Sequence, residues 1–230
     1  YDELKELVDL YKYKFWSVAK FWAEALVRQG KIEEALAYAQ SYLKDGYDIS
    51  SIYDFCEKVL LAAGRTEEAY AKFALEIPES GTYLSVYRHV CTKYPAKDKR
   101  QILLDLIEKS GRKGKWFAAA KEAGYLDIAL ECAETGEGDP KTLLRAVRDY
   151  SEKEPKFALQ VGIEALLIVL TCEFTEPITP MIISMAYSKV AAAAQKTNRL
   201  DWFQAELAKK VLQNSLKMKP KLREAIMKQL

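Results

Sequence analysis

Apolar side chains recur every three or four residues along much of the chain. The pattern is clearest in four segments, 141–150, 155–170, 181–196 and 200–216. This spacing places apolar side chains on one face of an α-helix, whereas a half-buried strand would alternate apolar and polar residues. No alternating segment is found. The pattern therefore predicts an all-α fold.

Three prolines indicate where helices should begin. Pro140, Pro180 and Pro220 each follow a polar residue and open a segment with helical periodicity. Proline suits the first position of a helix, because the N–H that it lacks would have no partner there. We expect a helix to start at each of these prolines.

A short motif occurs twice near the N-terminus. The sequence QGKIEEA at 29–35 matches AGRTEEA at 63–69, at an offset of 34 residues. In each copy the glycine can take the left-handed conformation that often follows a helix C-terminus. The alanine that ends each motif, Ala35 or Ala69, would let two helices approach closely. Each copy is therefore a predicted helix–turn–helix pair.

The offset of 34 residues resembles the unit of the tetratricopeptide family. Trp22 and Ala23 occupy places in the first helix where the family prefers a large residue followed by a small one, and a weaker third echo of the motif lies at 124–129. The resemblance implies helix pairs whose apolar faces are buried by stacking on neighbouring pairs.

The tetratricopeptide spacing is kept over about residues 14–78. In the second copy Cys56 and Glu57 stand in the large and small places, and Gly64 and Gly124 are 60 residues apart, which is not a multiple of 34. We therefore expect a tetratricopeptide-like solenoid of about 12–14 antiparallel helices with a divergent C-terminal half. The expected domains are 1–135, with the repeats, and 136–230, which continues the solenoid and ends in a basic helix.

The later helices resemble the helical tail of bacterial SWIM zinc-finger proteins. The segments 143–146, 155–159, 187–193 and 201–203 carry this resemblance, which would span about residues 50–228. The chain contains neither the Cys-x-Cys pair nor the Cys-x-His pair of the finger itself. The finger's nucleic-acid role therefore does not transfer to this chain.

Composition indicates a globular protein. Half of the residues are apolar and 30% are charged, which excludes a disordered chain. The longest strongly apolar run, 165–172, is much shorter than the roughly 20 residues that cross a bilayer, so no membrane span is predicted. The sequence begins at Tyr1 with no leader pattern, and we expect a cytoplasmic protein that is part of a longer chain.

The cysteines do not indicate a metal site. Cys56, Cys91, Cys132 and Cys172 are 35, 41 and 40 residues apart, with no CxxC pair. A secreted disulfide framework would be denser. Free cysteines pack as small apolar side chains, so we expect four buried, reduced thiols and no zinc.

Candidate catalytic residues are few. The single histidine, His89, lies two residues from Cys91, a spacing that places the two side chains on different faces of a helix, and we expect a partly buried histidine. The segment 111–116 lacks the first glycine of a phosphate-binding loop and has Trp116 where a magnesium-binding hydroxyl should be. Acidic residues in 127–139 lack the spacing of a calcium loop. We expect no enzyme activity, no cofactor and no metal.

The charge is unevenly distributed although the net charge is only +2. Basic residues gather at 93–115 and 209–228, and such clusters could neutralise phosphates. This favours a second hypothesis, an accessory domain associated with nucleic acid. The expected basic patch comprises Arg112, Lys113, Lys115, Lys217, Lys219, Lys221 and Arg223.

The leading hypothesis is a non-enzymatic scaffold that binds a peptide or a partner domain on a concave helical surface. The tetratricopeptide resemblance implies that six side chains face this surface: Ser17, Lys20, Glu24, Ser51, Asp54 and Lys58. Family members that hold chaperone C-terminal carboxylates use a Lys and Asn arrangement there. Glu24 stands in the Asn place, so that class of ligand is disfavoured. A solvated face without a ligand stays open as an alternative.

Overall fold

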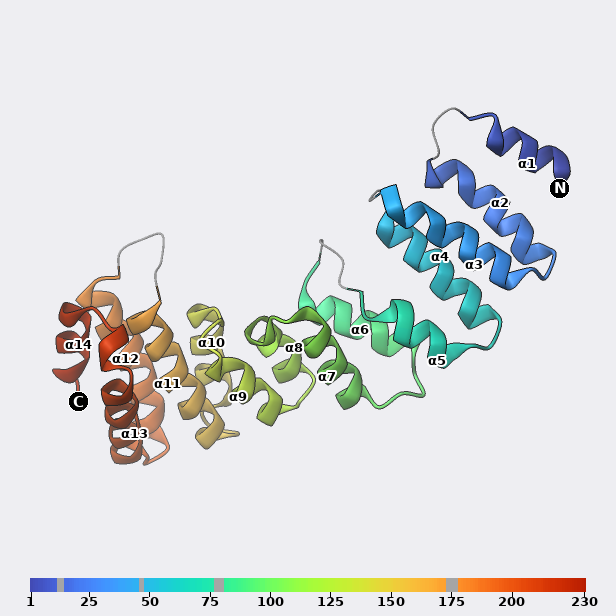
Figure 1. Ribbon diagram of the computed structural model, residues 1–230. Helices are drawn as coiled ribbons and strands as arrows, with labels where there is room; N and C mark the ends of the chain where they lie inside the picture. The colour runs from blue at the N-terminus through green and yellow to red at the C-terminus, as the bar shows by residue number, and fades with distance from the viewer. Residues whose placement is uncertain (12–14, 46–47, 77–80, 173–177) are drawn as a thin grey trace. The chain divides into compact units, whose positions relative to one another are not determined.

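The computed structural model describes residues 1–11, 15–45, 48–76, 81–172 and 178–230. Within these ranges the chain forms fourteen α-helices, a few short 3-10 or π-helical turns, and no strand (Figure 1). The prediction of an all-α fold is confirmed.

The chain forms two compact units. The first unit comprises residues 1–81 and 88–109, and the second comprises 82–87 and 110–230. The helices of the first unit are α1 (Asp2–Asp9), α2 (Trp16–Arg28), α3 (Ile32–Ser41), α4 (Ile49–Ala62), α5 (Thr66–Ala69), the C-terminal part of α6 (Tyr83–Lys93) and α7 (Lys99–Ser110).

The helices of the second unit follow a 3-10 turn at Lys113–Trp116. They are α8 (Phe117–Glu122), α9 (Leu126–Glu134), α10 (Pro140–Tyr150), α11 (Pro155–Thr171), α12 (Pro180–Lys196), α13 (Leu200–Gln213) and α14 (Pro220–Met227). The domain boundary expected after residue 135 falls within this unit, between α9 and α10.

The three copies of the motif share one turn geometry. Gly30, Gly64 and Gly124 have φ angles of 75°, 75° and 84°. Each follows a helix and is followed two residues later by the next helix: α2 and α3, α4 and α5, α8 and α9. A side chain is strained at such φ values, which accounts for glycine at all three places.

The alanines of the motif lie at helix contacts. Ala35, Ala69 and Ala129 are each 0% exposed, and the helices of each pair contact one another. The first turns of α3 and α5 carry two glutamates each, which interact favourably with the positive end of the helix dipole. The predicted helix–turn–helix pairs are confirmed locally.

The prolines begin helices as expected. Pro140, Pro180 and Pro220 are the first residues of α10, α12 and α14. Asp139 caps α10, because its carboxylate accepts a hydrogen bond from the Thr142 N–H at 3.0 Å. Thr179 caps α12 by accepting one from the Ile182 N–H at 3.4 Å.

The core of the second unit surrounds α11. Nearly every side chain of this helix is buried, and the helix contacts α9, α10, α12 and α13. The apolar run at 165–172 is therefore explained by burial against four neighbouring helices. In the described part of the chain, no helix is both long enough and apolar enough to cross a membrane.

The cysteines are not all buried. Cys56 and Cys132 are buried, Cys91 is half-buried and Cys172 is exposed at the end of α11. The expectation of four buried thiols is therefore wrong for Cys172, because the helix and its buried face end just before it. Burial raises the pKa of both the Cys56 and the Cys132 thiols from 9.0 to about 11.

Replacement of a motif alanine tests the close helix contact. Ala35→Leu inserts a larger side chain where α3 leaves no space and should lower the free energy of unfolding by about 1–3 kcal/mol. Ala37→Leu makes the same change at an exposed position of α3 and should leave stability nearly unchanged. Urea unfolding followed by circular dichroism compares them, and equal effects would contradict the close contact at Ala35.

Thiol labelling tests cysteine burial. At about pH 8, a pKa raised by two units leaves about 100-fold less thiolate, which is the reactive form. Dithionitrobenzoate should therefore modify Cys172 rapidly in the folded chain, and should modify Cys56 and Cys132 only after denaturant is added. Rapid labelling of either buried thiol in the native chain, identified by mass spectrometry, would be inconsistent with this packing.

Candidate functional site

A groove between α2 and α4 collects most of the side chains expected on the concave surface. Lys20 and Glu24 on α2, and Ser51, Asp54 and Lys58 on α4, line this α2–α4 groove. The sixth expected residue, Ser17, is exposed on α2 and is not among the lining residues.

The α2–α4 groove combines apolar and charged lining residues. Its volume is about 410 Å³, and its floor is formed by apolar side chains that include Val27, Phe55 and Val59. Trp16 lies beside Phe55, with ring centroids 5.3 Å apart and nearly perpendicular planes. The Trp16 indole N–H also donates a hydrogen bond to the Ser51 hydroxyl at 3.2 Å. These contacts hold α2 against α4.

The charges of the α2–α4 groove are largely paired. Lys58 Nζ lies 2.6 Å from Asp54 Oδ2, and Lys20 Nζ lies 3.7 Å from Glu24 Oε1. Partial burial would raise the pKa of the Asp54 carboxyl, but the hydrogen bond and charge of Lys58 and the charge of Lys93 together lower it. Arg28 also lines the groove and forms no ion pair with any described residue, so the lining presents mixed charge with a net value of +1 to a ligand.

A buried glutamate lies next to this groove. Its structural role was not predicted from the sequence. Glu57 on α4 is 5% exposed. It accepts a hydrogen bond from the Tyr94 hydroxyl at 2.8 Å and pairs with Lys93, which also lies 3.6 Å from Asp54. Burial is the main cause that raises the pKa of the Tyr94 hydroxyl, and the hydrogen bond to Glu57 is the second. The sequence did contain a signal for this role: Glu57 stands 34 residues after Ala23, at a position where the repeat prefers a small side chain.

Much of the first basic cluster is neutralised within the chain. Lys93 pairs with Glu57, Lys97 with Glu67 at 2.7 Å, Lys109 with Glu76 at 2.9 Å and Lys113 with Glu131 at 2.7 Å. Residues 93–109 also belong to the first unit and 110–115 to the second. Arg112 and Lys115 are exposed.

The second basic cluster lies around the start of α14. Lys217, Lys219, Lys221 and Arg223 are exposed, and they form no ion pair with any described residue. In Figure 1 the helices α9–α12 lie between this segment and the turn that carries Lys115. The seven residues expected as a basic patch therefore occupy separate places.

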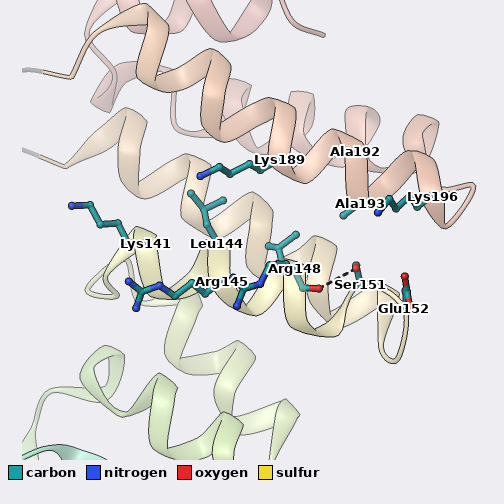
Figure 2. A pocket seen from close by; sticks show the side chains of 11 residues that line it. Lys141, Leu144, Arg145, Arg148, Ser151, Glu152, Lys189, Ala192, Ala193 and Lys196 are labelled. Atoms are coloured by element: carbon teal, nitrogen blue, oxygen red, sulfur yellow. Dashed lines mark hydrogen bonds between the residues drawn. The ribbon is translucent and has the colours of Figure 1, made fainter.

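A larger groove lies between α10 and α12, with a volume of about 910 Å³. Figure 2 shows its walls: Lys141, Arg145 and Arg148 project from α10, and Lys189 and Lys196 from α12. The lining also includes the apolar side chains Leu144, Val147, Ala192 and Ala193, and the acidic Glu152. Sequence reasoning did not single out this α10–α12 groove.

A glycine on α11 fixes the distance between the walls of the α10–α12 groove. A Cβ atom at Gly162 would lie 2.6 Å from Val190 Cγ1 on α12 and 3.1 Å from Val147 Cγ2 on α10. Both α10 and α12 contact α11 and each other. The absent side chain at Gly162 therefore lets both helices pack closely on α11.

The residues considered for catalysis lie in α6 and in the turn before α8. His89 is exposed, not partly buried as expected, and it flanks the face of α6 that Val86, Tyr87 and Val90 bury. The segment 111–116 forms a turn with Gly111 at a φ of 62°, and Trp116 is fully buried. The described residues include no group of three or more His, Cys, Asp or Glu side chains placed to hold a metal ion.

Comparison with protein-family models, curated proteins and solved structures finds no match to this chain. The resemblances to tetratricopeptide units and to SWIM-protein tails therefore stay predictions from the sequence.

Gly162→Ala tests the packing that forms the α10–α12 groove. Alanine favours a helix over glycine by about 1 kcal/mol, but its Cβ would displace the Val190 and Val147 side chains. We expect a net loss of about 1–3 kcal/mol in the free energy of unfolding, measured by urea denaturation. An unchanged or increased stability would show that α10 and α12 do not pack this closely on α11.

Proposed function

We propose that this chain is a tetratricopeptide-like helical-repeat solenoid with a divergent C-terminal half. On this proposal it acts as a non-enzymatic scaffold that binds a peptide or partner domain at the α2–α4 groove. The observation that carries the proposal is the gathering of Lys20, Glu24, Ser51, Asp54 and Lys58 around one groove. These residues were expected together on the basis of the repeat alone.

The local repeat supports the stacked arrangement. The pairs α2–α3 and α4–α5 have glycines with the same φ and alanines with the same burial, and α3 contacts α4. Arg65 of the second copy forms an ion pair with Glu33 of the first. Contacts of this kind between successive copies are what stacking of repeat units requires.

The make-up of the groove supports a peptide ligand with both apolar and charged side chains. Apolar floor residues could accept an apolar side chain, and the rim could exchange its internal pairs, such as Lys58–Asp54, for pairs with the ligand. Exposed ion pairs contribute little stability, with a median of about 0–1 kcal/mol, so the exchange costs little.

The hypothesis of a nucleic-acid accessory domain loses part of its motivation. Lysines 93, 97, 109 and 113 are already paired with carboxylates, which reduces the charge that the segment 93–115 offers to phosphates. The segment 209–228 keeps unpaired lysines, and its role in binding nucleic acid stays a prediction.

Selection from a phage-displayed library of random short peptides tests the scaffold proposal. The selection uses the whole chain, with counter-selection against the double variant Lys20→Glu/Lys58→Glu. Peptides enriched on the wild type should bind the double variant at least about tenfold more weakly, because reversal of two rim charges disrupts pairing with the ligand. Fluorescence anisotropy measures the affinities.

Lys44→Glu serves as the matched control, because Lys44 is an exposed residue of the same unit outside the groove. Circular dichroism verifies that each variant is folded. The proposal would be rejected if no peptide were enriched, or if the enriched peptides bound the double variant as well as the wild type.

A further inference from the structure

The α10–α12 groove concentrates positive charge in two facing rows. Lys141, Arg145 and Arg148 follow a helical spacing of four and three residues on α10, and Lys189 and Lys196 are seven residues apart on α12. At about 1.5 Å of rise per residue, each row is about 10 Å long. Figure 2 shows these side chains on the two helices. The rows suit an elongated ligand that lies along the groove.

Most of this charge has no internal partner. Arg148 pairs with Asp149 at 2.7 Å, but the other four cationic side chains form no ion pair within the ranges that the structure describes. Five cationic residues against Glu152 give the lining a charge of +4. This differs from the α2–α4 groove, where Lys20 and Lys58 both have carboxylate partners.

Unpaired like charges around one groove repel each other and attract an anionic ligand. Between surface charges the energies are moderate and sensitive to salt, but several cations that act together raise both the rate and the selectivity of association with an anion. The charge therefore indicates an acidic ligand.

The lining between the two rows distinguishes between acidic ligands. It includes Leu144, Val147, Ala192 and Ala193, and it contains no aromatic side chain. Proteins that bind single-stranded nucleic acid typically stack the bases on aromatic rings, which this groove does not offer. Small apolar residues between two helices instead fit the apolar face of an amphipathic segment.

We propose that the α10–α12 groove binds an acidic amphipathic segment of a partner protein. Aspartate and glutamate side chains of that segment pair with the cationic rows, and its apolar side chains contact Leu144 and the alanines of α12. This inference rests on the proposed scaffold role, because it takes the ligand to be a protein. It concerns the second unit and the α10–α12 groove, whereas the proposed function concerns the first unit and the α2–α4 groove.

The same displayed peptide library tests this inference, with counter-selection against the double variant Arg145→Glu/Lys189→Glu. These two residues come from opposite walls, and both are exposed, so the variant should fold. Enriched peptides should be rich in Asp and Glu, with apolar residues three or four positions apart. Their affinity for the double variant should fall at least about tenfold.

Two controls separate this site from others. Lys153→Glu makes a similar charge reversal on an exposed residue in the turn after α10 and should leave the affinity nearly unchanged. Lys20→Glu/Lys58→Glu should also have no effect, so that failure at one groove is distinguishable from failure at the other. Replacing the Asp and Glu residues of an enriched peptide by Asn and Gln should abolish binding.

Several outcomes would overturn the inference. Enrichment of peptides without acidic residues, equal binding to the double variant, or no enrichment would each do so. A homopolymeric single-stranded DNA or RNA that binds more tightly than any enriched peptide, with a steep salt dependence and with loss of binding in Arg145→Glu/Lys189→Glu, would assign the groove to nucleic acid instead.

Discussion

Close approach of helices at small residues is the constraint on which the packing of both units depends. In the first unit, Ala35 and Ala69 lie where α2–α3 and α4–α5 meet, next to glycines that reverse the chain within three residues. In the second unit, Gly162 allows α10 and α12 to pack on α11. A larger side chain at these positions would have to displace a neighbouring helix. At the α10–α12 groove, a residue outside the lining thus sets how closely the two wall helices pack on α11.

The two grooves differ in whether their cationic side chains are paired with carboxylates. In the α2–α4 groove Lys58 pairs with Asp54, and next to the groove the buried Glu57 pairs with Lys93 and accepts a hydrogen bond from Tyr94. Burial of a carboxylate without such partners would be costly. In the α10–α12 groove most cations face solvent without a carboxylate. A ligand of mixed charge suits the first groove, and an acidic ligand suits the second.

The sequence was sufficient for features that depend on local rules. The left-handed glycines and the helix starts at Pro140 and Pro180 follow from backbone conformation and capping alone. The buried alanines were expected because a close helix contact needs a small side chain. Five residues that the tetratricopeptide resemblance would place on one surface line the α2–α4 groove, but the repeat stacking behind that expectation stays a prediction. Helical spacing also places Lys141, Arg145 and Arg148 on one face of α10. It could not reveal which later helix would face them, because α10 and α12 are separated in sequence by α11.

The most direct test of the account is amide hydrogen–deuterium exchange of the whole chain, with and without an acidic peptide selected on the α10–α12 groove. Exchange in α10 and α12 should become slower when the peptide is bound, because the ligand suppresses local opening of the helices that it contacts. Exchange in α2 and α4 should not change. Slower exchange in other helices without any change in α10 and α12 would contradict the assignment of this groove as a protein-binding site.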